Sequence, residues 1–144
     1  RRRDNRRRGA ADETVAGIAG KAVKECRYHL QHSVTWVIRL GDGTEESHAK
    51  VQQSLNDLLP YVGDLFHSDA VTQTAASEGW GVDPAGLREG WNARLEDMLA
   101  ESGLTRPDPV PEQVGGREGR HTEQLSYLLA EMQVLPRTYP DAQW

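Results

Sequence analysis

A helical repeat of apolar residues near the start of the chain constrains the fold more than any other feature. Between residues 14 and 40 the apolar positions recur at steps of three or four: Val15, Ile18, Ala22, Cys26, Leu30, Val34 and Val37. This spacing predicts a helix of about seven turns with one apolar stripe. The stripe stops at residues 41–43, Gly-Asp-Gly, where a glycine can adopt the positive φ of a helix end. Because Asp42 or Thr44 can cap a second helix, we expect a helical hairpin.

The second helix of this hairpin is expected over residues 44–66. Its predicted buried positions are Val51, Leu55, Leu58, Leu59, Val62, Leu65 and Phe66. Pro60 should kink the helix, because proline has no amide proton and crowds the preceding turn.

A short helix is expected over residues 69–77. Asp83 followed by Pro84 predicts the start of another helix, which Gly103 should end.

The last part of the sequence predicts an irregular connecting segment followed by a final helix. Residues 104–120 contain three of the seven prolines and three glycines, so we expect irregular structure there. Leu125, Leu128, Leu129, Met132 and Leu135 then form a helical stripe. Pro136 should end that helix. The prediction is an all-α fold of four main helices and one short helix, packed as a bundle.

Charge divides the chain into two unlike parts. Residues 1–8 hold six arginines and one aspartate, which leaves 11 basic and 21 acidic side chains in the other 136 residues. We predict a disordered leader over residues 1–14 and a helical domain over residues 15–144. Because the domain is acidic, we expect no nucleic-acid partner. No apolar run is long enough to cross a membrane, and one cysteine indicates no disulfide, so we expect a cytoplasmic protein without a membrane partner.

A helical bundle can hold two metal ions when two of its helices carry Glu-x-x-His units. That spacing occurs at Glu45 to His48 and at Glu118 to His121. Both pairs lie at or before predicted helix starts, where acidic residues are favoured by the helix dipole and the centre of a bundle is out of reach. We therefore expect neither pair to bind metal.

The long first helix also lacks the unit, because the third residue after Glu25 is Tyr28. We predict no metal ligand and no catalytic residue in this chain. Cys26, within the apolar stripe, is predicted to be a buried small hydrophobic residue rather than a nucleophile. The alternative is a small ferritin-like di-metal protein that acts by itself. Its ligands would be Glu45, His48, Glu123 and Glu131.

The loop over residues 115–123 is a candidate anion site. Its glycines allow close approach of the backbone, Arg117 and Arg120 supply positive charge, and the next helix offers free amide groups. The competing interpretation is a basic turn capped by Thr122, with Glu118 offsetting part of the charge. Arg117 and Arg120 are therefore predicted to contact an anionic ligand or an acidic partner surface, or to lie in solvent.

Several unusual strings occur together in this chain: KAVKECRYHLQHSVTWVIRLGDGTEESH, LLPYVGDLF, GVDPAGLREGW and GGREGRHTEQLSYLLAEMQVLPRTYPDAQW. From about residue 16 to Trp144 they resemble the PaaC-type subunits of ring-1,2-phenylacetyl-CoA epoxidases, of the ferritin-like PaaA/PaaC family. The family subunit is considerably longer, so the resemblance implies the C-terminal part of such a subunit.

This resemblance implies a structural role within a multicomponent oxygenase of aerobic phenylacetate degradation. The chain would pair with a related catalytic subunit that holds a di-iron centre, while the chain itself would carry no cofactor. The other epoxidase components and a reductase would be further partners. The expected function is thus that of a component of an epoxidase that is not catalytic in itself.

Overall fold

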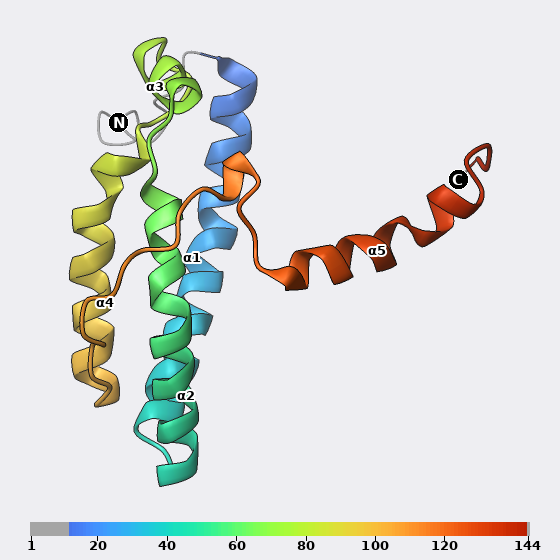
Figure 1. Ribbon diagram of the computed structural model, residues 1–144. Helices are drawn as coiled ribbons and strands as arrows, with labels where there is room; N and C mark the ends of the chain where they lie inside the picture. The colour runs from blue at the N-terminus through green and yellow to red at the C-terminus, as the bar shows by residue number, and fades with distance from the viewer. Residues whose placement is uncertain (1–11, 144) are drawn as a thin grey trace. The chain divides into compact units, whose positions relative to one another are not determined.

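The computed structural model describes residues 12–143, and within this range every regular element is a helix (Figure 1). The chain divides into two compact units, Arg1–Gln113 and Val114–Trp144. The described residues form four main α-helices, one short α-helix and three short 3-10 helices. The predicted all-α fold is confirmed, while the Arg-rich run at residues 1–8 lies outside the described residues.

Helices α1 (Glu13–Gly41) and α2 (Glu45–Leu58) form the predicted hairpin. Helix α1 begins at Glu13, two residues before the expected start of the domain, because the Asp12 carboxylate accepts a hydrogen bond from the Val15 amide at 2.9 Å. Thr44 caps α2, as predicted: its hydroxyl accepts from the Ser47 amide at 3.2 Å, and Ser47 Oγ accepts from the Thr44 amide at 3.0 Å. These reciprocal bonds form a capping box.

The prediction of a positive φ in the hairpin turn is wrong. Gly79, Gly103, Gly115 and Gly119 are the glycines with positive φ in the described range, and neither glycine of the turn is among them. Gly41 serves another purpose, because a Cβ at this position would lie 2.6 Å from the Ser102 carbonyl oxygen and 2.9 Å from Ser102 Cβ. Glycine therefore allows the end of α1 to approach the end of α4 (Arg88–Ser102) closely.

Pro60 changes the type of helix in the second element. Helix α2 ends at Leu58, and the chain continues as the 3-10 helix η2 (Leu59–Phe66) with the proline at its start. The disturbance predicted at Pro60 thus takes the form of a tighter helix, since proline cannot donate the next bond of an α-helix. The short helix α3 (Ala70–Ser77) follows, close to the predicted range.

Helix α4 ends as the sequence predicts, whereas the start predicted at Asp83 and Pro84 is a 3-10 helix and the α-helix itself begins at Arg88. Asp83 Oδ1 accepts a hydrogen bond from the Ala85 amide at 3.0 Å, and the first turn is the 3-10 helix η3 (Pro84–Leu87). At the other end, Gly103 adopts φ 69°, the left-handed conformation of a glycine C-cap.

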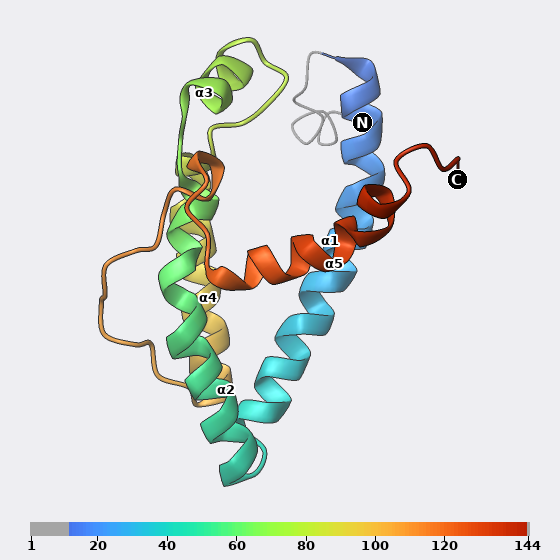
Figure 2. The same ribbon diagram turned by 45° about the vertical axis from the view of Figure 1, so that its right-hand side comes forward.

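The core of the first unit lies between α1, α2 and α4 near the hairpin turn. Three leucines are buried there: Leu95, Leu99 and Leu104. Partly buried residues from all three helices and from η2 pack against them: Val37, Val51, Leu55, Leu59, Trp91 and Met98. Figure 2 shows α1 close to α2 at the turn and diverging from it toward its own start.

This divergence corrects the prediction for Cys26. The residue is exposed, whereas the apolar stripe predicted a buried position. Ile18 on the same stripe is also exposed. A periodic pattern predicts which face of a helix is apolar, but burial depends on whether another element lies against that face, and the first half of α1 has left α2 and α4.

The second unit contains the 3-10 helix η4 (Gly116–Glu118) and helix α5 (Glu123–Thr138). The prediction that Pro136 ends this helix is wrong by two residues, since α5 continues to Thr138. A proline near the end of a helix removes only one internal bond. The last turn is held by the Tyr139 amide, which donates to the Leu135 carbonyl at 2.9 Å, and by the Thr138 hydroxyl, which donates to the Val134 carbonyl at 2.6 Å.

Candidate functional site

Of the Glu45 and His48 pair, the histidine supports the hairpin. Both residues lie in the first turn of α2, and His48 Nδ1 is 2.7 Å from the Gly41 carbonyl oxygen. This ring nitrogen therefore bonds a carbonyl at the end of α1, which an α-helix leaves without an internal partner. The contact gives this histidine a role in holding the hairpin turn.

The other predicted ligand positions do not form a metal site. Between Glu118 and His121, Gly119 adopts φ 84°, so the pair does not share one helical turn. Glu123 and Glu131 are eight residues apart in α5, which separates them by about 12 Å along the helix axis. Within residues 12–143, no group of three or more His, Cys, Asp or Glu side chains could hold a metal ion. The residues present do not fit the di-metal alternative.

The predicted anion loop folds on itself. The Gly115 carbonyl accepts hydrogen bonds from the Glu118 amide at 2.9 Å and from the Arg120 amide at 3.0 Å. Gly115 and Gly119 both have positive φ, at 104° and 84°, which a residue with a side chain rarely adopts. A Cβ at Gly115 would lie 2.8 Å from Arg120 Cδ, so this glycine leaves room for the arginine stem.

The structure does not identify what the two arginine side chains of this loop bind. Arg117 and Arg120 are both exposed, and Arg117 already takes part in an interaction within the chain. Among the residues that the structure describes, Thr122 stands at the N-cap of α5 without a capping hydrogen bond from its side chain. The capped turn expected in the competing interpretation is therefore absent from this range. The role of the two arginines stays a prediction.

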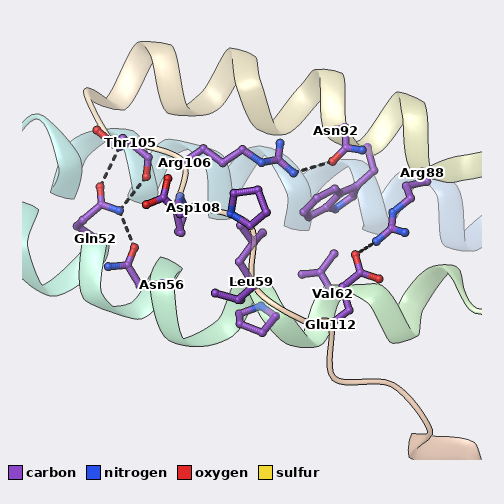
Figure 3. A pocket seen from close by; sticks show the side chains of 15 residues that line it. Gln52, Asn56, Leu59, Val62, Arg88, Asn92, Thr105, Arg106, Asp108 and Glu112 are labelled. Atoms are coloured by element: carbon purple, nitrogen blue, oxygen red, sulfur yellow. Dashed lines mark hydrogen bonds and ion pairs between the residues drawn. The ribbon is translucent and has the colours of Figure 1, made fainter.

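A second site, which the sequence did not reveal, lies under the segment 104–113, named here the strap. At its first end the Gln52 side-chain amide donates to the Thr105 carbonyl at 2.8 Å and accepts from the Thr105 amide at 2.9 Å (Figure 3). At its other end the Gln113 amide donates to the Pro60 carbonyl at 2.8 Å. The strap is thus tied to the middle of α2 and to the start of η2.

Two arginines tie the strap to α4. Arg106 donates to Asn92 Oδ1 at 3.0 Å and forms an ion pair with Glu96, and Arg88 forms an ion pair with Glu112. Figure 3 shows the contacts of Arg106 with Asn92 and of Arg88 with Glu112 in the lining of one pocket. Because each arginine faces a glutamate, the charges of the arginines are largely compensated.

The pocket has a volume of about 1010 Å³ and is lined by the strap together with α2, η2 and α4. Beside it, Phe66 and Trp91 meet edge to face with their ring centroids 5.7 Å apart, and the Arg88 guanidinium carbon lies 5.4 Å from the Phe66 ring centroid. Compensated charges and aromatic packing make this a support for the strap rather than a site that attracts free ions.

The sequence contains only part of the signal for this arrangement. Pro107, Pro109 and Pro111 alternate with other residues, and residues before proline favour extended backbone, so an extended strap could have been predicted. The contact that anchors it, between Gln52 and Thr105, joins residues 53 positions apart and leaves no local pattern. In the described part of the chain, no helix is long and apolar enough to cross a membrane.

Comparison with known proteins gives two matches. The family model described as phenylacetic acid catabolic protein matches residues 5–144. The chain is also similar to the subunit lettered C of the 1,2-phenylacetyl-CoA epoxidase of Escherichia coli (strain K12), with 42% identity over 133 residues. The aligned region covers 92% of this chain and 54% of that protein, so the chain spans about half the length of the curated relative it matches. The family match begins earlier than the expected start near residue 16.

Proposed function

Since the chain belongs to the family of phenylacetic acid catabolic proteins, we propose that it serves as the structural, non-catalytic subunit of a phenylacetyl-CoA epoxidase. The observation that carries this proposal is the 42% identity to the Escherichia coli epoxidase subunit across 92% of the chain. The enzyme would epoxidise the aromatic ring of phenylacetyl-CoA in the cytoplasm, during aerobic phenylacetate degradation.

In this proposal the iron chemistry belongs to a partner. A related ferritin-like subunit would carry the di-iron centre, which activates oxygen with electrons from a separate reductase. The geometry of the candidate ligands supports this division of roles. Glu123 and Glu131 are too far apart along α5 to bind one ion. The chain would therefore contribute surface and stability to the complex.

Co-expression with the cognate iron-bearing subunit tests this function. We expect the two chains to purify as one complex, with iron bound by the partner. Purified alone, this chain should contain far less than one iron atom per chain. Stoichiometric iron in the unpartnered chain, lost in Glu131→Ala and retained in the control Glu89→Ala, would instead establish the di-metal alternative. Failure of the wild-type chains to associate would contradict the structural role.

The double change Arg117→Ala and Arg120→Ala is expected to weaken an anionic contact of the assembled enzyme. Two arginines in a tight glycine loop before α5 combine charge, donors and close approach. If coenzyme A phosphates are the target, the apparent KM for phenylacetyl-CoA should rise by the equivalent of about 1–3 kcal/mol, while the subunits still associate. Steady-state kinetics of the purified complex measures this.

If an acidic surface of the partner is the target, the same variant should co-purify less well than wild type at low salt, the difference should shrink as salt is raised, and KM of the remaining complex should be unchanged. Arg137→Ala, in the last turn of α5, is the matched control and should alter neither property. Normal assembly and normal kinetics in the double variant would show that the loop is a solvated turn.

A further inference from the structure

Helix α1 carries a row of exposed aromatic rings that the proposed function does not by itself explain. Tyr28 and His32 stack with ring centroids 6.2 Å apart, and His32 meets Trp36 edge to face at 6.3 Å. The Arg39 guanidinium carbon lies 5.9 Å from the centroid of the Trp36 ring. These four residues, at steps of three or four, form one row along the helix and are named here the aromatic ladder.

The aromatic ladder lies on the side of α1 that faces away from α2 and α4. Val37 packs in the core, and Leu30 and Val34 line a groove with Arg94 and Met98 of α4. At about 100° per residue, the ladder falls about half a turn from these inward residues. Within the described residues, every ring contact of the ladder is made inside α1 itself.

Aromatic side chains are unusual on the outer face of an amphipathic helix, which ordinarily carries polar residues. Tyr28 is 67% exposed and Trp36 is 47% exposed. Tyrosine, tryptophan and arginine are the residue types enriched at the centres of protein interfaces. Because the rings already stack on one another, their ordering on binding costs less side-chain entropy than that of isolated rings. The ladder thus has the residue composition of a protein interface, and its rings are already held in place by stacking.

Charge indicates the chemistry of the partner. Lys21, Lys24 and Arg39 lie along the same outer face, with Glu25 as the acidic residue among them. This face is therefore positive, although the whole chain has a formal net charge of -5. A local positive face on an acidic protein attracts an acidic surface, while the remaining charge repels the nucleic-acid backbone.

We propose that the aromatic ladder docks on the iron-bearing subunit, against a helical surface that combines acidic side chains with exposed apolar ones. This inference rests on the proposed function and names the surface through which it operates. Apolar side chains of the partner would cover Tyr28 and Trp36, and its carboxylates would meet Lys21, Lys24 and Arg39. A second copy of the chain is the competing occupant.

The test is the affinity of purified variants for the cognate iron-bearing subunit, measured by titration calorimetry. Tyr28→Ala combined with Trp36→Ala should raise Kd about 30-fold or more, as expected for the loss of interface hot spots. The matched control combines Tyr127→Ala with Trp80→Ala, whose side chains are 63% and 45% exposed. This control should leave Kd within about threefold of the wild-type value.

Charge reversal tests the electrostatic part. Lys21→Glu combined with Lys24→Glu should raise Kd at low ionic strength, and the difference from wild type should shrink as salt screens the charges. A salt-independent Kd, unchanged by this reversal, would overturn the acidic character assigned to the partner surface.

Each other outcome also decides the inference. If wild type binds the iron-bearing subunit and the ladder variant binds equally well, the inference fails while the proposed function stands. If wild type does not bind, the proposed function fails and the inference fails with it. Loss of self-association in the ladder variant, seen by sedimentation with Kd unchanged, would assign the ladder to a second copy. A fall in unfolding free energy as large as that of a core variant would place the rings inside the fold and overturn the docking role.

Discussion

Leu99→Ala is expected to lower the free energy of unfolding by about 2–5 kcal/mol, the range for removing a buried leucine from a packed core. Leu99 is only 3% exposed and lies in the one cluster where α1, α2 and α4 meet within the described residues. The loss combines the transfer of methyl and methylene groups with the cavity that remains. Chemical denaturation of the first unit, followed by circular dichroism, measures the change.

Leu58→Ala is the matched control, since Leu58 is 65% exposed at the end of α2. It should change the unfolding free energy by no more than about 0.5 kcal/mol. Equal losses in the two variants would mean that the three-helix cluster is not the stabilising core, and the packing described for α4 would be wrong.

Gly41→Ala is expected to destabilise the hairpin by about 1–3 kcal/mol, the usual range for overpacking. The added Cβ would lie 2.6 Å from the Ser102 carbonyl oxygen, which is backbone and cannot move aside as a flexible side chain can. Helices α1 and α4 would have to separate where their ends meet. Thermal and chemical unfolding of the variant measure the loss.

The same substitution elsewhere in α1 should have the opposite sign. Nothing lies within 4 Å of a Cβ built at Gly20, in the same helix. Gly20→Ala should therefore stabilise the helix by about 0.5–1 kcal/mol, because alanine loses less backbone entropy than glycine. Stabilisation by Gly41→Ala as well would show that α1 and α4 do not approach as closely as described.

Together these two pairs of variants test where the apolar pattern is buried. The sequence predicted several helix ends because their signals are local: capping residues such as Thr44 and Asp83, and a glycine end at Gly103. It failed at Pro136, where a proline close to a helix end is tolerated. A local rule states a preference, and neighbouring hydrogen bonds decide whether the preference holds.

Among the candidate sites, too, those with a local sequence pattern were considered from the sequence, and the one that depends on a distant contact was missed. The spacing around Glu25, Glu45 and Glu118 led to the prediction that this chain has no metal ligand, and metal analysis of the purified chain tests that prediction. The strap was not predicted as a packed element, since its anchor joins Gln52 to Thr105 across the chain. The anionic role of Arg117 and Arg120 remains for experiment.

By itself the sequence determined the all-α fold, the order of the helices and membership of the phenylacetic acid catabolic protein family. Helix periodicity, capping residues and sequence identity can all be read from the order of the residues alone. Only the tertiary structure decided that Cys26 is exposed, that Gly41 is a close-packing residue and that the aromatic ladder faces away from the core. These properties depend on which elements lie against each other, because burial is a relation between segments distant in sequence rather than a property of any one of them.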